Sequence, residues 1–433
     1  MKQALGFTAL ASAALMLMLA SSSPVLAKDS SSKDKPEVQY PNATRVAPKL
    51  DLTSEKDQKN LNAGLDAVTA NDKAKALQYL QPIADGGSKS KYAQALALQG
   101  LATVKYQIDN DPKGAIALLQ QSLANGVLPN DTYFQLEYML AQFQVADEEY
   151  QPALDTLTKW RAEGKKETAN SYALEGNIDY RLGKFPEAIA AIKKAQSLTD
   201  KPDPAWNQIL MASYSQSGQG DQAAQVAQQA LAANPNDPNA LDNTVAVLMQ
   251  ANKNDEAIQV MEKARASGSL KTEANYVNLA KLYLIRAQSS STDSKPDAEK
   301  SAQVLEDGMS KSIVTASADN YLLLGEADEL SDNTSKAVDA YTKALPIAKD
   351  GEAAIRGGQI LLSQQKYSAA KSMIQQGIDK GVKQKGAAYM LLAESDRGLK
   401  DKAGAIAAMK QAAQDPQTAE KANAWLKKAG AGK

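Results

Sequence analysis

The sequence has no histidine and no cysteine among its 433 residues. It therefore lacks a thiol nucleophile, an imidazole general base, a Ser-His-Asp triad and the ligands of a structural zinc site. Disulfides are excluded as well, and we expect no catalytic residues, no metal and no cofactor. A substrate-binding or enzymatic protein is an alternative that these absences weaken.

Large aromatic side chains and net charge are also scarce. Aromatic residues make up 5% of the chain, and 49 Lys and Arg nearly balance 50 Asp and Glu. The net charge of −1 provides no global field for nucleic acid or an anionic membrane, so we expect no nucleic-acid partner. A core with so few large side chains must rely on Ala and Leu, which favours closely packed helices.

Residues 1–27 have the pattern of a secretory signal peptide. Lys2 precedes a run of small and apolar residues at positions 4–20, and residues 25–27 match a signal-peptidase site. We expect cleavage after Ala27 and no transmembrane segment in the mature chain, with a retained membrane anchor as the alternative. Export of a chain without cysteine fits the periplasm of a Gram-negative bacterium.

Residues 28–52 form a distinct segment that is rich in Ser, Lys, Asp and Pro. Such a segment cannot bury much apolar surface. We therefore predict a disordered or extended leader over these residues.

Residues 53–416 repeat with spacings of 33 to 44 residues. One small residue marks each repeat, at Ala76, Ala115, Ala153, Ala188, Ala223, Ala257, Ser301, Ala337, Ala370 and Ala405. In most repeats the positions seven residues later and twelve residues earlier are also small. Because antiparallel helices approach closely only where side chains are small, each repeat is predicted to be a helical hairpin. Gly, Asn and Asp between the two helices are typical turn residues.

Two stretches carry a family resemblance. Residues 172–195 and 210–235 combine the small positions with the turn and the aromatic residues in a pattern that resembles the tetratricopeptide repeat. The resemblance implies an all-α fold, namely a right-handed α-solenoid of about ten helical hairpins with a C-terminal capping helix in residues 417–433. Ser122 and Trp160 replace a small residue in early repeats, where the register is left open.

The C-terminal third is similar to exported tetratricopeptide proteins of Gram-negative bacteria. The similarity covers the last 110 residues or so and includes the tail after Asp415. Some of those proteins are accessory periplasmic components of TonB energy-transduction systems. The resemblance therefore implies such a role as one alternative.

One spacing, from Ala257 to Ser301, is stretched by an insertion at residues 287–297. The insertion is rich in Ser, and such segments are normally solvated loops. A partner-binding loop is the alternative interpretation.

The first helix of each hairpin is expected to line the concave groove of the array. Offsets of −3, +1 and +4 from its small residue place side chains on one stripe. The polar side chains of this stripe form the candidate partner-binding groove: Tyr138, Gln142, Asn177, Tyr180, Gln208 and Asp242. Tyr with amide side chains suits an extended peptide, whereas a hydrated surface is the alternative. The sequence thus predicts an exported, non-catalytic protein–protein interaction scaffold of the cell envelope.

Overall fold

The computed structural model describes residues 38–49, 51, 54–289 and 293–431. Regular secondary structure in these ranges is helical, without a strand, which confirms the all-α prediction. The predicted signal peptide lies outside the described residues. The chain forms two compact units, Met1–Ala230 and Leu231–Lys433, which divide within α10 (Gly220–Ala233).

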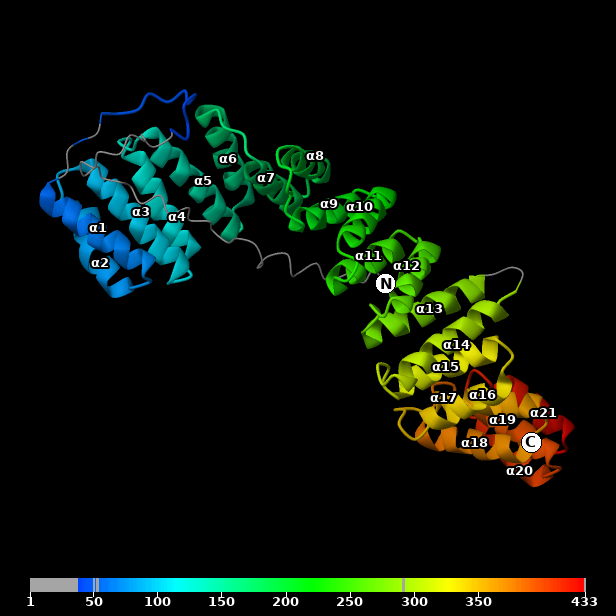
Figure 1. Cartoon of the computed structure of the whole chain (residues 1–433). Coiled ribbons are helices and arrows are strands. Elements are labelled where there is room, and N and C mark those ends of the chain that lie inside the picture. The colour runs from blue at the N-terminus through cyan, green and yellow to red at the C-terminus, as the bar shows by residue number, and fades with distance from the viewer. Residues whose placement is uncertain (1–37, 50, 52–53, 290–292, 432–433) are drawn as a thin grey trace. The chain divides into compact units, whose positions relative to one another are not determined.

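The first unit contains five pairs of helices joined by short turns (Figure 1). Their bounds are α1 (Glu55–Thr69), α2 (Lys73–Pro82), α3 (Lys91–Gln107), α4 (Pro112–Ala124), α5 (Asn130–Ala146), α6 (Tyr150–Gly164), α7 (Ala169–Arg181), α8 (Phe185–Ser197), α9 (Ala205–Gln216) and α10, with a π-helical turn at Ile83–Gly87. The helices of the first four pairs pack on each other, and α2, α4, α6 and α8 each pack on the helix that follows.

The second unit continues with five further pairs and one last helix. Their bounds are α11 (Pro238–Gln250), α12 (Asn254–Ala266), α13 (Glu273–Ser289), α14 (Lys295–Ser310), α15 (Ala318–Leu330), α16 (Thr334–Ala344), α17 (Glu352–Ser363), α18 (Tyr367–Lys380), α19 (Lys385–Gly398), α20 (Lys402–Ala412) and α21 (Ala419–Lys428). The last helix packs on α20 as the predicted cap. Each unit is therefore an α-solenoid of successive helical pairs, and the described residues contain the ten pairs that were expected.

The small residues that revealed the repeat lie in the hairpin cores. All ten of them are at most 2% exposed. The buried hydroxyl of Ser301 donates a hydrogen bond to the carbonyl of Ala280 on the paired helix, at 2.8 Å. Ser122 does the same with the carbonyl of Ala95, also at 2.8 Å. A serine is therefore tolerated at these positions because a backbone acceptor is within reach.

In nine hairpins, all but α13–α14, the turn uses a residue in the left-handed region five positions before the small residue. These residues are Asn71, Asn110, Glu148, Gly183, Gly218, Asn252, Asp332, Gln365 and Lys400. Three second helices have an aspartate as N-cap, and its carboxylate accepts a backbone N–H of the first turn. These residues are Asp72, Asp111 and Asp401. Such caps satisfy an N–H that the helix cannot satisfy itself.

Part of the predicted disordered leader is packed against the first unit. Residues 38–49, called the N-terminal strap here and dark blue in Figure 1, have no helix or strand and contact α5 and the ends of α4 and α6 through hydrogen bonds. Tyr40 is only 6% exposed. The prediction of disorder is therefore wrong for the strap, because one buried aromatic and several hydrogen bonds hold a segment whose composition is otherwise polar.

The loop within the Ser-rich insertion is also shorter than expected. Helix α13 extends to Ser289 and α14 begins at Lys295, so most of the predicted loop at 287–297 is helical. Residues 290–292 lie outside the described residues. Arg286 on α13 pairs with Asp297 on α14 at 2.6 Å, and this ion pair ties the lengthened helices together.

Candidate functional site

The six residues of the predicted groove are distributed over both units. Gln142, Asn177 and Gln208 are partly exposed on the first helices α5, α7 and α9. The ring centroid of Tyr180 on α7 lies 5.9 Å from the ring centroid of Phe185. Asp242 is exposed on α11 and belongs to the second unit.

Tyr138 on α5 is partly exposed and packs against an aromatic cluster. Its ring lies 5.1 Å from that of Trp160 on the paired helix α6. Burial raises the pKa of Tyr138 to about 12. One side of the ring therefore packs on an aromatic cluster, because Trp160 occupies a position where most repeats carry a small residue.

A hollow of about 610 Å³ lies on the first helices of the second unit. It is lined by Gln288 on α13, by Glu326, Glu329 and Leu330 on α15, and by Arg356 and Gln359 on α17. We call this set the first-helix hollow. First helices of successive hairpins are also neighbours in this unit, since α13 contacts α15 and α17 contacts α19.

The offset rule from the sequence holds at this hollow. Glu326 and Glu329 follow the small residue Gly325 by one and four positions, and Gln359 follows Gly358 by one. The sequence interpretation missed these residues because it applied the rule to repeats three to six alone. Gln288, Leu330 and Arg356 lie outside the stripe offsets, and only the structure places them at the hollow.

Charged and polar groups in the first-helix hollow are arranged as donors and acceptors. The Arg356 guanidinium lies 2.8 Å from the Glu326 carboxylate, and both side chains remain about 47% and 36% exposed. The buried Tyr341 hydroxyl donates to Glu329 at 2.8 Å, and burial raises the pKa of that tyrosine. The fixed carboxylates and the exposed guanidinium can bind the amide and carboxylate groups of an extended peptide.

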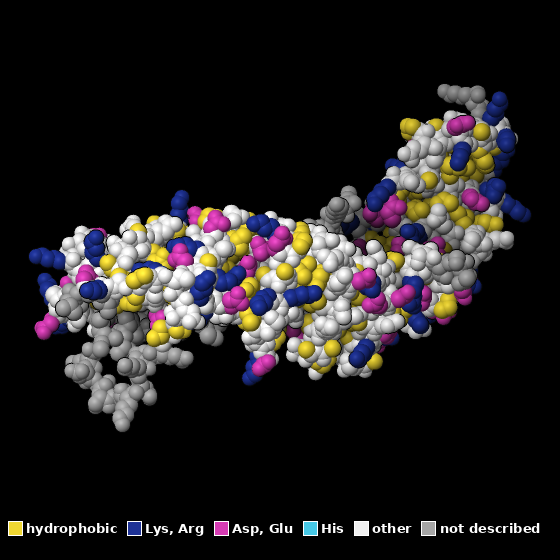
Figure 2. All heavy atoms as spheres, turned by 90° about the horizontal axis from the view of Figure 1, so that it is seen from above, with side chains coloured by type: hydrophobic (Ala, Val, Ile, Leu, Met, Phe, Trp, Pro, Cys, Tyr) yellow, Lys and Arg dark blue, Asp and Glu magenta, His cyan; other side chains and the backbone are white. Residues whose placement is uncertain are grey.

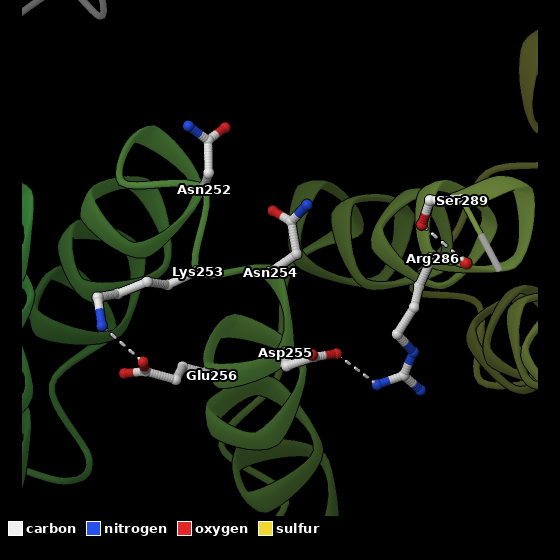
Figure 3. Close-up of a pocket in the computed structure, with 7 residues that line it drawn as sticks. All are labelled: Asn252, Lys253, Asn254, Asp255, Glu256, Arg286 and Ser289. Carbon is white, nitrogen blue, oxygen red and sulfur yellow. Dashed lines mark hydrogen bonds and ion pairs between the residues drawn. The ribbon is translucent and has the colours of Figure 1, made fainter. Parts of the chain in front are cut away.

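A second hollow, of about 330 Å³, lies at the turn before α12 and the end of α13. Figure 3 shows Asp255 and Arg286 reaching toward each other there, with 2.9 Å between the charged atoms. Lys253 pairs with Glu256 at 2.8 Å on the same side. Because these charges already pair with one another, the second hollow links hairpins and offers few groups to a ligand.

Buried carboxyl groups recur three positions after the small residue of the first helix. Asp179, Asp328 and Asp396 are each at most 5% exposed. The pKa of Asp179 and the pKa of Asp328 are both raised to about 6, mainly because the carboxyl groups are buried. Asp396 instead forms an ion pair with Lys371 on α18. These groups sit inside the hairpins, so they affect stability and not binding.

The charged surface is mixed in sign. On the face in Figure 2, Lys and Arg side chains are interspersed with Asp and Glu side chains. Among the described residues, no helix combines the length and apolar character needed to cross a lipid bilayer.

Paired helices, small residues at their crossings and a hollow on neighbouring first helices define a helical-repeat protein of the α-solenoid class. Residues 213–270 and 355–419 match the tetratricopeptide repeat family. The predicted family resemblance is thereby confirmed. Proteins built from such repeats generally mediate protein–protein interactions and are typically non-catalytic scaffolds.

Several solved structures are similar to the chain. The C-terminal part of a tetratricopeptide repeat protein from Cytophaga hutchinsonii has 19% identity and a TM-score of 0.40, and the match covers 66% of this chain and 97% of that one. A tetratricopeptide repeat protein from Parabacteroides merdae has 14% identity and a TM-score of 0.37, with 66% and 99% covered. The TPR2AB domain of yeast Sti1, in a complex with pHSP90, has 17% identity and a TM-score of 0.27, with 60% and 98% covered. Among curated proteins, none matches the chain.

Proposed function

We propose that this chain is an exported, non-catalytic scaffold of the cell envelope that binds an extended segment of a partner protein in the first-helix hollow. The observation that carries the proposal is the position of that hollow on the first helices α13, α15 and α17. Repeat proteins use such a surface, formed by equivalent positions of successive repeats, to bind their partners.

The chemistry of the first-helix hollow favours a peptide over a small molecule. Gln288 and Gln359 offer exposed amides from two different helices, and amides pair with the donors and acceptors of an extended backbone. Arg356 can exchange its surface ion pair with Glu326 for a carboxylate of the partner, since exposed ion pairs contribute only about 0–1 kcal/mol. Leu330 adds an apolar contact beside these groups.

Photo-crosslinking in intact cells tests the proposed groove. A photoreactive residue at Gln288 and one at Gln359 are expected to crosslink the same partner segment, identified by mass spectrometry. The same residue at Gln259 or Gln303, exposed on the second helices α12 and α14, serves as the control. Equal crosslinking from the control positions, or none from the hollow, would contradict the proposal.

Export is proposed from residues 1–27, which lie outside the described residues. The mature chain is then expected to begin at Lys28 and to fractionate with periplasmic proteins. N-terminal sequencing of the native protein tests this directly, and an intact Met1 would rule it out.

An accessory role in TonB energy transduction stays a hypothesis that rests on the resemblance of the C-terminal third. The crosslinking experiment tests this hypothesis. A TonB-linked role requires that a component of a TonB system is among the crosslinked proteins.

A further inference from the structure

The surface of the first unit beneath the N-terminal strap has the features of a second binding site for a peptide segment. The strap is anchored there by two side chains. Tyr40 enters between α5 and α6, and Arg45 reaches the turn between α4 and α5. The polypeptide between these two anchors makes a turn, in which the N–H of Ala43 donates to the carbonyl of Tyr40 at 3.3 Å.

The Tyr40 side chain is held by aromatic rings and by a glycine. Its ring centroid lies 5.0 Å from that of Phe134 and 6.0 Å from that of Trp160, which it meets edge-on. Gly164 forms one wall, since a Cβ atom there would lie 3.2 Å from the tyrosine ring. Lys166 lies over the ring, with its Nζ atom 4.4 Å from the centroid. The pocket therefore fits a flat aromatic side chain.

Arg45 is recognised by geometry as well as by charge. Its guanidinium donates to the carbonyl of Leu128 at 2.9 Å and to the Asn130 side-chain oxygen at 2.9 Å. It also donates to the carbonyl of Gly126 at 3.2 Å and lies 4.2 Å from the centre of the Tyr133 ring. A planar group with several donors suits this set of partners, whereas a lysine does not.

Backbone groups of the strap are recognised too. The carboxylate of Asp131 accepts the N–H groups of Gln39 and Tyr40, both at 3.1 Å. The N–H of Thr44 donates to the carbonyl of Glu163 at 2.8 Å. Side-chain anchors combined with hydrogen bonds to the backbone are a common way for proteins to bind peptide segments.

The strap buries few of its other apolar groups. Val38 is 59% exposed and Val46 is 89% exposed. Segments with few buried apolar contacts open at low free energy. At the far end, Asp51 accepts the N–H groups of Lys91 and Tyr92 at the start of α3, so this end stays fixed while residues 38–45 open.

From this geometry we propose that the strap is a displaceable occupant, and that its surface on α5 and α6 binds a partner segment with an aromatic residue followed five positions later by an arginine. This site is independent of the first-helix hollow, since it lies in the other unit. The strap holds the aromatic pocket closed until such a segment competes for it.

A labelled peptide with the sequence of residues 38–49 is the probe. In the purified chain, Tyr40→Ala combined with Arg45→Ala is expected to release the strap and to expose the site. Fluorescence anisotropy should then show the peptide binding at least about ten-fold more tightly to the double variant than to the unaltered chain, where the linked strap competes at high effective concentration. A peptide with both anchors replaced by Ala should not bind, and a Val46→Ala peptide should bind like the original.

A second measurement avoids dependence on the folding of that variant. Since the chain has no cysteine, Asn42→Cys in the otherwise unaltered strap takes a single fluorescent label. Excess unlabelled peptide should lower the anisotropy of this label as the strap leaves its site, and the peptide without anchors should not.

Three outcomes would overturn the proposal. One is a folded double variant, with native circular dichroism, that fails to bind the peptide. Another is equal binding to the unaltered chain and to the double variant. The third is a concentration-dependent dimer that the double substitution abolishes, because the occupant would then be the strap of a second copy.

Discussion

Gly176 on α7 lies against Ile192 on α8, and a Cβ atom at position 176 would come within 2.6 Å of the isoleucine side chain. The equivalent glycine of a later repeat, Gly325, has the same relationship to Tyr341 at 2.5 Å. In both hairpins the glycine stands opposite the residue four positions after the small alanine of the second helix. The absence of a side chain sets how closely the helices approach.

Gly176→Ala is therefore expected to destabilise the protein. Overpacking typically costs about 1–3 kcal/mol, whereas the better helix propensity of alanine returns only about 1 kcal/mol. Chemical denaturation monitored by circular dichroism should show a net loss of about 1 kcal/mol. Lys193→Ala, on the exposed face of α8, serves as the control and should change little. A variant as stable as the parent would mean that the hairpin can widen freely.

Gln365→Gly is expected to stabilise the turn between α17 and α18. Gln365 has a φ of 59°, a conformation that costs a residue with a Cβ atom about 1–2 kcal/mol. Glycine removes this strain but loses entropy on folding, so the net gain should be about 0.5–1 kcal/mol. Lys366→Gly is the matched control, since its φ of −82° is ordinary and glycine should only destabilise there. A loss of stability at both positions would contradict the strain argument.

Asp328→Asn should increase stability at neutral pH and have little effect in acid. The pKa of Asp328 is about 6 in the folded chain, above its usual value of about 3.9 in an unfolded one. The protonated group is thus favoured by folding, and its stabilising contribution is complete below about pH 4 and lost as the pH rises through 6. Asparagine resembles the protonated form at every pH.

Denaturation at pH 4 and pH 7.5 measures this difference. The expected gain at pH 7.5 is about 1–3 kcal/mol, because a shift of one pKa unit corresponds to about 1.4 kcal/mol. Asp319→Asn, on the exposed face of the same helix, provides the comparison. An equal effect of Asp328→Asn at both pH values would contradict the assignment of a raised pKa.

Tyr138→Ala should lower the melting temperature. The ring packs against Trp160 and the side chain is only partly exposed, so its removal leaves a cavity that costs about 2–4 kcal/mol. Gln142→Ala, one turn further along α5 and partly exposed, should leave the melt unchanged. An unchanged melting temperature of the Tyr138→Ala variant would instead support a position of this side chain in the groove, as the sequence predicted.

Arg356→Ala combined with Gln359→Ala should reduce capture of the crosslinked partner without a large change in stability. Arg356 and Gln359 are exposed, and the ion pair that is lost is a surface pair. The crosslinking yield from Gln288 is the readout, and thermal melting verifies the fold. A yield equal to that of the unaltered chain would exclude these side chains from binding.

The helical pairs could be predicted because their signal is periodic and purely steric. A small residue such as Ala188 must recur wherever two helices cross, and a left-handed turn residue such as Gly183 must precede it by a fixed distance. These constraints lie within one repeat, so the sequence of that repeat carries them.

Contacts that join distant segments left no such signal. Tyr40 sits in a polar leader, and nothing near it in sequence indicates the pocket formed by Phe134 and Trp160. For the same reason the stripe rule located Tyr138 on its helix correctly but could not show that Trp160 would cover it. Arg356 escaped prediction because its relation to Glu326 depends on the distance between two hairpins.

The N-terminal strap also has a consequence for the order of events during synthesis. The backbone of Tyr40 bonds to a carboxylate 91 residues further along the chain, whereas the helices are held mainly by neighbours close in sequence. Synthesis delivers the strap first, but its receptor is complete only after α6 has folded. Docking therefore follows the folding of α6, and protease cleavage within residues 38–45 would report, chain by chain, whether that step has taken place.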